Sequence, residues 1–91
     1  MKPEEIYQTA LSKWGMDSQL DMMVEECAEL INAIQKFRRN RIGSSDVVGE
    51  IADVEIMAGQ MRVIFGTDIV DMEKALKLKR LIERINQTEE K

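Results

Sequence analysis

Residues 20–37 read LDMMVEECAELINAIQKF, and this stretch decides the fold class. Apolar side chains recur in it at steps of three and four residues, which is the spacing of one face of an α-helix. The apolar positions are Leu20, Met23, Val24, Cys27, Leu30, Ile31, Ile34 and Phe37. We expect this helix to begin near Asp17 or Ser18, since both residue types are good N-caps, and to end before Gly43.

One further helix is predicted before this stretch and two after it, so the protein is expected to be all-α. The first helix opens at Pro3, a residue type favoured in the first helical turn, and closes at Trp14 before Gly15. No repeat, low-complexity tract or domain linker separates the helices. Residues 1–91 are therefore expected to form one domain, a four-helix-bundle-like arrangement with short connections.

The third and fourth helices are predicted on either side of Gly66, which is a suitable residue for the end of a helix. The candidate N-cap of the third helix is Ser44 or Ser45, and the fourth helix is expected to open at Thr67 or Asp68. A polar tail over residues 87–91 is expected to fray.

The composition excludes several classes of function. The 91 residues include no histidine and one cysteine, Cys27. Serine–histidine and cysteine–histidine catalysis, zinc sites of histidine or cysteine, and an internal disulfide are therefore ruled out. A net charge of -4 argues against a nucleic-acid partner, which needs a basic face. No apolar run reaches about 18 residues and no signal peptide opens the chain, so we expect a cytoplasmic protein with no membrane partner.

The small size of the chain favours a homo-oligomer, because a short chain buries only a modest share of its own surface. The third helix also carries a second apolar seam, on a face turned away from its main stripe. This seam consists of Ala52, Ile56, Gly59 and Val63. It predicts close packing against another subunit. The alternative is that the first or fourth helix covers the seam within the same chain.

Carboxylates occupy matching positions on the second and third predicted helices. Glu26 and Glu29 lie three residues apart, as do Glu50 and Asp53, so each pair shares one side of its helix. If the apolar stripes pack antiparallel, the two pairs meet at the rim of the seam between the helices. Two such charges about 4 Å apart repel by several kcal/mol, and a hard cation such as Mg²⁺ relieves that repulsion. For either pair alone, the alternative is a solvated helix face.

The pattern EECAE over residues 25–29, a gap of 20 residues, and EIAD over residues 50–53 resembles the signature of the all-α nucleoside triphosphate (NTP) pyrophosphohydrolases. That superfamily includes MazG-like proteins, dimeric dUTPases and phosphoribosyl-ATP pyrophosphohydrolases. The similarity is to short MazG-like proteins and spans about residues 14–84. It implies a MazG-type fold that assembles into a dimer or tetramer. It also implies hydrolysis of an NTP or dNTP to a nucleoside monophosphate and pyrophosphate, including house-cleaning of non-canonical nucleotides.

The same resemblance implies a role for each site residue. The implied ligands of Mg²⁺, for which Mn²⁺ can substitute, are Glu26, Glu29, Glu50 and Asp53. The implied catalytic residues are Glu25 and Glu26, with Glu25 either an extra ligand or the base for the attacking water. The implied phosphate-binding residues are Lys36, Lys77, Arg80 and Arg84. The chain departs from the family at Leu81, where members often have an Asn, and it lacks their Tyr-Pro pair, which puts its phosphate and sugar contacts in doubt.

Recognition of the nucleoside is the part of the function that the sequence defines least. Trp14 precedes the acidic helix and offers a face for base stacking, although packing on the core is the interpretation we prefer for it. No residue set distinguishes a dNTP, a damaged nucleotide or a canonical NTP.

Three other functions stay open at this stage. A phosphoribosyl-ATP pyrophosphohydrolase shares the superfamily and the reaction, so only its substrate differs. A non-catalytic helical interaction module would keep the fold with a vestigial metal site. An acidic helical adaptor would bind no ligand at all, and the sequence also leaves dimer and tetramer open.

Overall fold

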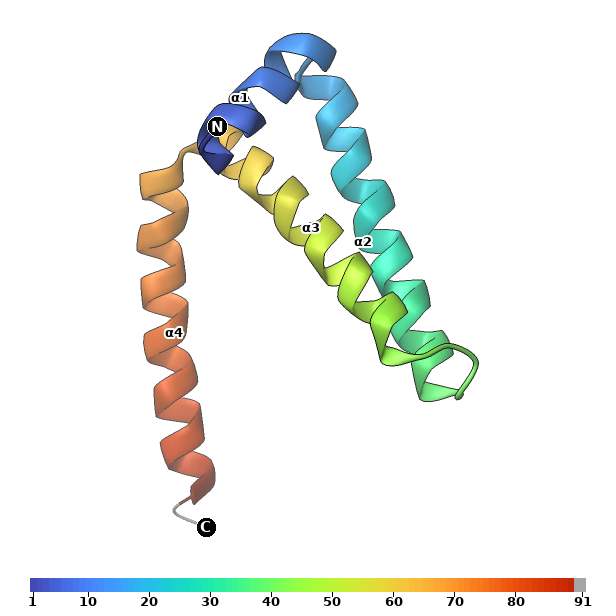
Figure 1. Ribbon diagram of the computed structural model, residues 1–91. Helices are drawn as coiled ribbons and strands as arrows, with labels where there is room; N and C mark the ends of the chain where they lie inside the picture. The colour runs from blue at the N-terminus through green and yellow to red at the C-terminus, as the bar shows by residue number, and fades with distance from the viewer. Residues whose placement is uncertain (90–91) are drawn as a thin grey trace.

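The computed structural model describes the backbone of residues 1–89 and the side chains of residues 1–87. This part of the chain forms four α-helices and no strand, so the all-α prediction is confirmed. The helices are α1 (Pro3–Trp14), α2 (Met16–Arg38), α3 (Ser44–Phe65) and α4 (Thr67–Glu89) (Figure 1). None of them, over the described residues, is both long enough and apolar enough to cross a membrane.

Helices α2 and α3 form an antiparallel hairpin, and α1 packs across the end of the hairpin that lies opposite the connecting loop (Figure 1). In that loop Asn40 has a φ of 61°, a left-handed conformation that Asn adopts more readily than most residues. Ala33 of α2 and Met57 of α3 are buried in the hairpin. The small side chain of Ala33 lets the two helices approach closely. The hairpin is therefore the packed part of the chain and fixes the positions of the side chains it carries.

The predicted N-caps of α2 and α3 are both wrong, by one to three residues. α2 begins directly after Gly15 and not at Asp17 or Ser18. Gly15 has a φ of 88°, which glycine adopts without strain, so this single residue is enough to join α1 to α2. α3 has Gly43 at its N-cap, and both candidate serines lie inside its first turn. Neither helix start has a side-chain capping hydrogen bond.

Gly66 forms the joint between α3 and α4. Its φ is 109°, and its backbone N–H donates to the carbonyl oxygen of Arg62 at 2.8 Å, so α3 ends where predicted. The Arg62 side chain also forms an ion pair with Asp71 of α4, with a nitrogen–oxygen distance of 2.7 Å. A one-residue joint and one ion pair therefore determine the direction in which α4 leaves α3.

Helix α4 diverges from the hairpin and, over the described residues, contacts only α3 (Figure 1). It begins at Thr67, one of the two predicted starts, and stays helical to Glu89, through most of the tail predicted to fray. Residues 90–91 of that tail lie outside the described residues. The apolar side chains of α4 are exposed, among them Leu78, Leu81, Ile82 and Ile85. The predicted four-helix bundle therefore does not close within one chain.

The chain exposes more surface than a compact protein of its mass. Its accessible surface is 7345 Å², whereas a folded monomer of this size exposes roughly 5,400 Å². Its radius of gyration is 16.5 Å, against about 12 Å for a compact domain of this length. The buried side chains among residues 1–87 are Gln19, Ala33, Met57 and Gln60. A single chain thus holds a hairpin with a small core and long uncovered apolar stripes.

The second seam of α3 is partly covered within the chain. The ring of Tyr7, on α1, lies so close to Gly59 that an added Cβ at Gly59 would overlap it. At this position the first helix covers the seam within the chain, as the alternative predicts. Farther from α1 the seam is open, and Ile56 is 48% exposed.

Candidate metal centre

Three carboxylates of the hairpin converge on one point. Glu26 and Glu29 come from α2 and Glu50 comes from α3, and each offers an oxygen within 4.8 Å of the other two. The first two are brought together by their three-residue spacing on a helix, and the third by the antiparallel packing of α3 on α2. Glu26 and Glu50 are half-buried, whereas Glu29 is exposed. The predicted meeting of acidic residues from the two helices is found for these three.

The two half-buried carboxylates lie in an environment that disfavours their charge. Oε2 of Glu26 and Oε2 of Glu50 are both buried and have no hydrogen-bond partner. Burial raises the pKa of Glu26 above its ordinary value, and the charges of Glu29, Asp53 and Glu50 raise it further. Burial likewise raises the pKa of Glu50, with added contributions from Glu29, Asp53 and Asp46. Unpartnered oxygens with raised pKa values are expected where carboxylates gather to bind a cation.

Asp53 and Glu25 lie outside the group of three. Asp53 is exposed, and its charge raises the pKa values of Glu26 and Glu50, so it is near enough to interact with both. Glu25 is exposed and precedes Glu26 on α2. The structure therefore joins three of the four predicted ligands directly and places the fourth in their electrostatic surroundings.

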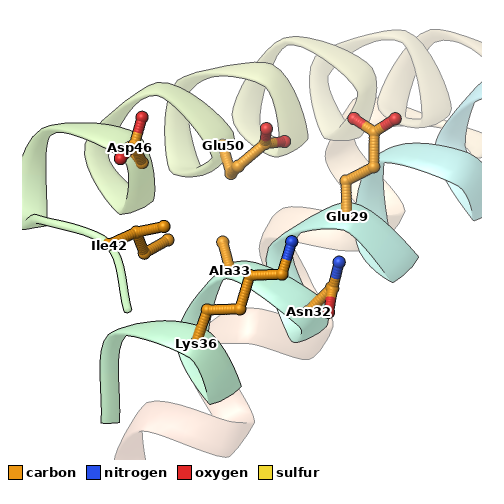
Figure 2. A pocket seen from close by; sticks show the side chains of 7 residues that line it. All are labelled: Glu29, Asn32, Ala33, Lys36, Ile42, Asp46 and Glu50. Atoms are coloured by element: carbon orange, nitrogen blue, oxygen red, sulfur yellow. The ribbon is translucent and has the colours of Figure 1, made fainter. Parts of the chain in front are cut away.

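A pocket of about 280 Å³ opens beside the carboxylates, and Lys36 lines it together with Glu29 and Glu50 (Figure 2). The Lys36 side chain comes from α2, one to two turns after Glu29, and its nitrogen points toward the space between the two carboxylates (Figure 2). Of the four predicted phosphate-binding residues, Lys36 is the one that the chain brings to the acidic cluster.

Two further residues of this pocket were missed by the sequence analysis. Asn32 lies three residues after Glu29, and Asp46 lies four residues before Glu50, so each extends an acidic helix face by one turn toward the loop. The helical spacing that identified the carboxylates also identifies these two positions. In the sequence alone this spacing does not single them out, because isolated polar residues on an exposed helical turn are common.

The basic residues of α4 are not brought to the cluster within one chain. Lys77, Arg80 and Arg84 follow a spacing of three and four residues, which puts them on one side of α4. The pocket beside the carboxylates is lined by α2, α3 and their loop, without α4. Lys77 instead lines a shallow apolar depression along α4 itself, with Leu78 and Leu81. A single chain thus separates these cations from the carboxylates.

Trp14 lies at the corner between α1 and α2 and is 58% exposed, so the preferred prediction of core packing is wrong for one chain. The ammonium group of Lys13 lies 5.6 Å from the centre of its ring. Glu29 is roughly 20 Å farther along α2, at about 1.5 Å per residue. Base stacking on Trp14 stays a prediction, and within one chain this ring is distant from the pocket beside the cluster.

Comparisons with known proteins give no match to a family model, a curated protein or a solved structure. The likeness to the NTP pyrophosphohydrolases therefore depends on the acidic motifs and their spacing. What the structure adds independently is an all-α chain with an acidic cluster between two of its helices.

Proposed function

We propose that the protein is a Mg²⁺-dependent nucleoside triphosphate pyrophosphohydrolase, which converts an NTP or dNTP and water into a nucleoside monophosphate and pyrophosphate. One observation carries the proposal. Glu26, Glu29 and Glu50 converge from two helices, and a buried oxygen of Glu26 and another of Glu50 have no protein partner. The acidic motifs that supply these residues are the ones that resemble the family signature.

The donor set fits a hard divalent cation. Carboxylate oxygens at a shared point are ligands suited to Mg²⁺ or Mn²⁺, and the chain has no histidine and a single cysteine to offer a softer metal. In this proposal Glu26, Glu29, Glu50 and Asp53 hold the ion. Bound there, the ion neutralises phosphate oxygens and lowers the pKa of a water molecule.

Other steps of the reaction, the acceptance of a proton and the binding of the phosphates, are assigned to side chains of the protein. Glu26 of the carboxylate cluster, or Glu25 beside it in the sequence of α2, accepts a proton from the attacking water. Lys36 offers its ammonium group to the phosphates from the adjoining pocket. A covalent nucleophile is not required for this reaction.

The proposal includes assembly into a homo-dimer or homo-tetramer of MazG-like type. The chain exposes roughly 1,900 Å² more than a compact monomer of its mass, so two chains that bury this excess against each other remove roughly 3,800 Å² in total, within the range of about 2,000–5,000 Å² for obligate homodimers. The uncovered apolar stripe of α4 is adjacent on the helix to Lys77, Arg80 and Arg84. A second chain packed on that stripe receives these cations, so the predicted phosphate-binding residues of α4 act in trans.

The test is release of pyrophosphate from a panel of NTPs, dNTPs and phosphoribosyl-ATP, with Mg²⁺ and with a chelator. We expect turnover of at least one substrate that stops on chelation, and thermal stabilisation by millimolar Mg²⁺, because a ligand that binds only the folded state raises its stability. Stabilisation without turnover on any substrate would favour the non-catalytic module. An unchanged melting temperature would favour the adaptor and exclude the proposed site.

A further inference from the structure

The pocket beside the carboxylates combines nitrogen donors from α2 with carboxylate acceptors from α2 and α3. Lys36 and Asn32, both from α2, point their nitrogens toward the gap between the helices (Figure 2). Glu50 and Asp46 of α3 line the opposite side of the pocket, with Asp46 nearer the loop, and Glu29 of α2 lies at the pocket's edge (Figure 2). A ligand in this pocket meets the nitrogen donors of α2 and carboxylates from both helices.

The size and lining of the pocket define how much of a nucleotide it can take. Its volume of about 280 Å³ is just below the range of roughly 300–1,000 Å³ that encloses a drug-sized ligand. Its apolar lining consists of Ala33 and Ile42, and no aromatic side chain lines it to stack on a base. The pocket is thus large enough for two linked phosphates, and it lacks the aromatic surface that would favour a base.

Charge determines the form in which phosphates enter. Three carboxylates line the pocket against the single ammonium group of Lys36, so a bare polyphosphate is repelled. A polyphosphate bound to a divalent cation would be repelled less, because the cation neutralises part of its charge and would be attracted by the carboxylates. Asn32 adds a hydrogen-bond donor without adding charge, which suits a ligand whose charge is already largely neutralised.

We propose that Asn32 is a substrate-binding residue which, with Lys36, holds the two phosphates that leave as pyrophosphate, while the nucleoside extends out of this pocket. This role of Asn32 depends on the proposed function, and it also defines which end of the nucleotide enters the pocket. Hydrolysis forms a bond between the water oxygen and the α-phosphorus and breaks the bond from that phosphorus to the bridging oxygen. The bridging oxygen departs with the β- and γ-phosphates into the pocket of Asn32, and a carboxylate takes the water proton.

The test compares binding of each half of the product by calorimetry. Wild type, Asn32→Ala and Asn32→Asp are titrated with Mg²⁺ alone, with pyrophosphate in Mg²⁺, and with nucleoside monophosphate in Mg²⁺. We expect the Kd for pyrophosphate to rise about tenfold in Asn32→Ala, the loss of one hydrogen bond to a charged group, and more in Asn32→Asp, which adds repulsion. The Kd for Mg²⁺ and for the monophosphate should change less than about twofold. Gln35→Glu makes the same amide-to-acid change at an exposed residue of α2 outside the pocket, and it should leave all three values unchanged.

The outcomes separate this inference from the proposed function. If wild type binds Mg²⁺ and pyrophosphate while both Asn32 variants bind pyrophosphate equally well, only this inference is overturned. The same holds if the variants lose the monophosphate as strongly as pyrophosphate. If pyrophosphate binding depends on Asn32 but no nucleotide is hydrolysed, the pocket stands and the proposed activity fails. If wild type binds neither Mg²⁺ nor pyrophosphate, both are overturned.

Discussion

The α2–α3 hairpin and α4 differ in how far one chain completes them. The hairpin buries Ala33 and Met57 and brings three carboxylates within 4.8 Å of one another. Helix α4 is as long as α2, yet over the described residues it contacts only α3 and exposes its apolar stripe. The hairpin therefore brings its acidic cluster together within one chain, whereas the same chain leaves the stripe of α4 uncovered.

The difference follows from the two connections. A five-residue loop after Arg38 turns the chain back, so that α3 packs along α2. The single residue Gly66 starts α4 at once in a new direction, which the ion pair between Arg62 and Asp71 supports. We expect a second chain to cover the apolar stripe of α4 and to supply the basic residues of its own α4 to the site. The carboxylates of the site come from one hairpin. Five predictions, in order of expected effect, test this difference between the hairpin and α4.

The largest effect is expected inside the hairpin. Glu29→Ala should lower kcat/KM about a hundredfold or more, since the metal supplies several kcal/mol of charge stabilisation. The fold should persist, because Glu29 is exposed and its removal relieves repulsion within the cluster. Pyrophosphate release and far-ultraviolet circular dichroism measure the two properties. Glu55→Ala removes an exposed acid of α3 outside the cluster as a control, and equal activity in both variants would exclude Glu29 as a ligand.

The next effect is expected on α4. Leu81→Asp places a charge within the exposed apolar stripe, and we expect it to raise the Kd for subunit association about a hundredfold. Sedimentation equilibrium measures this Kd, and activity should fall in parallel if the cations of α4 act in trans. Gln87→Glu adds the same charge on the far side of α4 and should leave association intact. A wild type that is monomeric at all concentrations would contradict the assembly.

The cations of α4 should affect substrate more than metal. Lys77→Ala is expected to lower kcat/KM about tenfold through loss of a phosphate contact, with an unchanged Kd for Mg²⁺. Lys79→Ala is the matched control, because Lys79 lies on a different side of α4 from Lys77, Arg80 and Arg84. Equal effects of the two substitutions would remove Lys77 from the site.

Substitutions at two glycines of α3 test the packing of α1 on that helix. Gly59→Ala should lower the free energy of unfolding by about 1–3 kcal/mol, because its Cβ overlaps the ring of Tyr7. Gly49→Ala meets no atom within 4 Å, and it should be neutral or stabilising by up to about 1 kcal/mol through its helix propensity. Chemical denaturation compares the two, and a stabilised Gly59→Ala would contradict the packing of α1 on α3.

The smallest effect concerns pH. The raised pKa values of Glu26 and Glu50 mean that the folded, metal-free protein binds these protons more tightly than the unfolded chain does. Its melting temperature should therefore rise as pH falls through the raised pKa values toward the ordinary value of 4.5. Mg²⁺ should weaken this trend, because it needs the ionised carboxylates. Glu26→Gln should flatten the metal-free profile, and a slope unchanged from wild type would show that Glu26 does not titrate in this range.

Much of the hairpin was predictable because its information is local. The period of the apolar stripe gave α2, and the three-residue spacing gave the pairing of Glu26 with Glu29. The helix starts were less predictable. Gly15 has a positive φ that joins α1 to α2 within one residue, whereas Gly43 takes the N-cap position of α3 with an ordinary extended backbone. Asn32 and Asp46 were missed because a single polar residue can be assigned to a pocket only when the position of the opposite helix is known.

By itself the sequence determined the four helices, the acidic faces of two of them, and the exclusion of histidine and paired-cysteine chemistry. These properties depend on side chains close together along the chain or on composition. Only the tertiary structure decided which carboxylates meet, that Lys36 joins them, and that α4 stands apart with its cations. Those depend on the direction in which each connection sends the next helix, and a change at one residue such as Gly66 moves every atom beyond it.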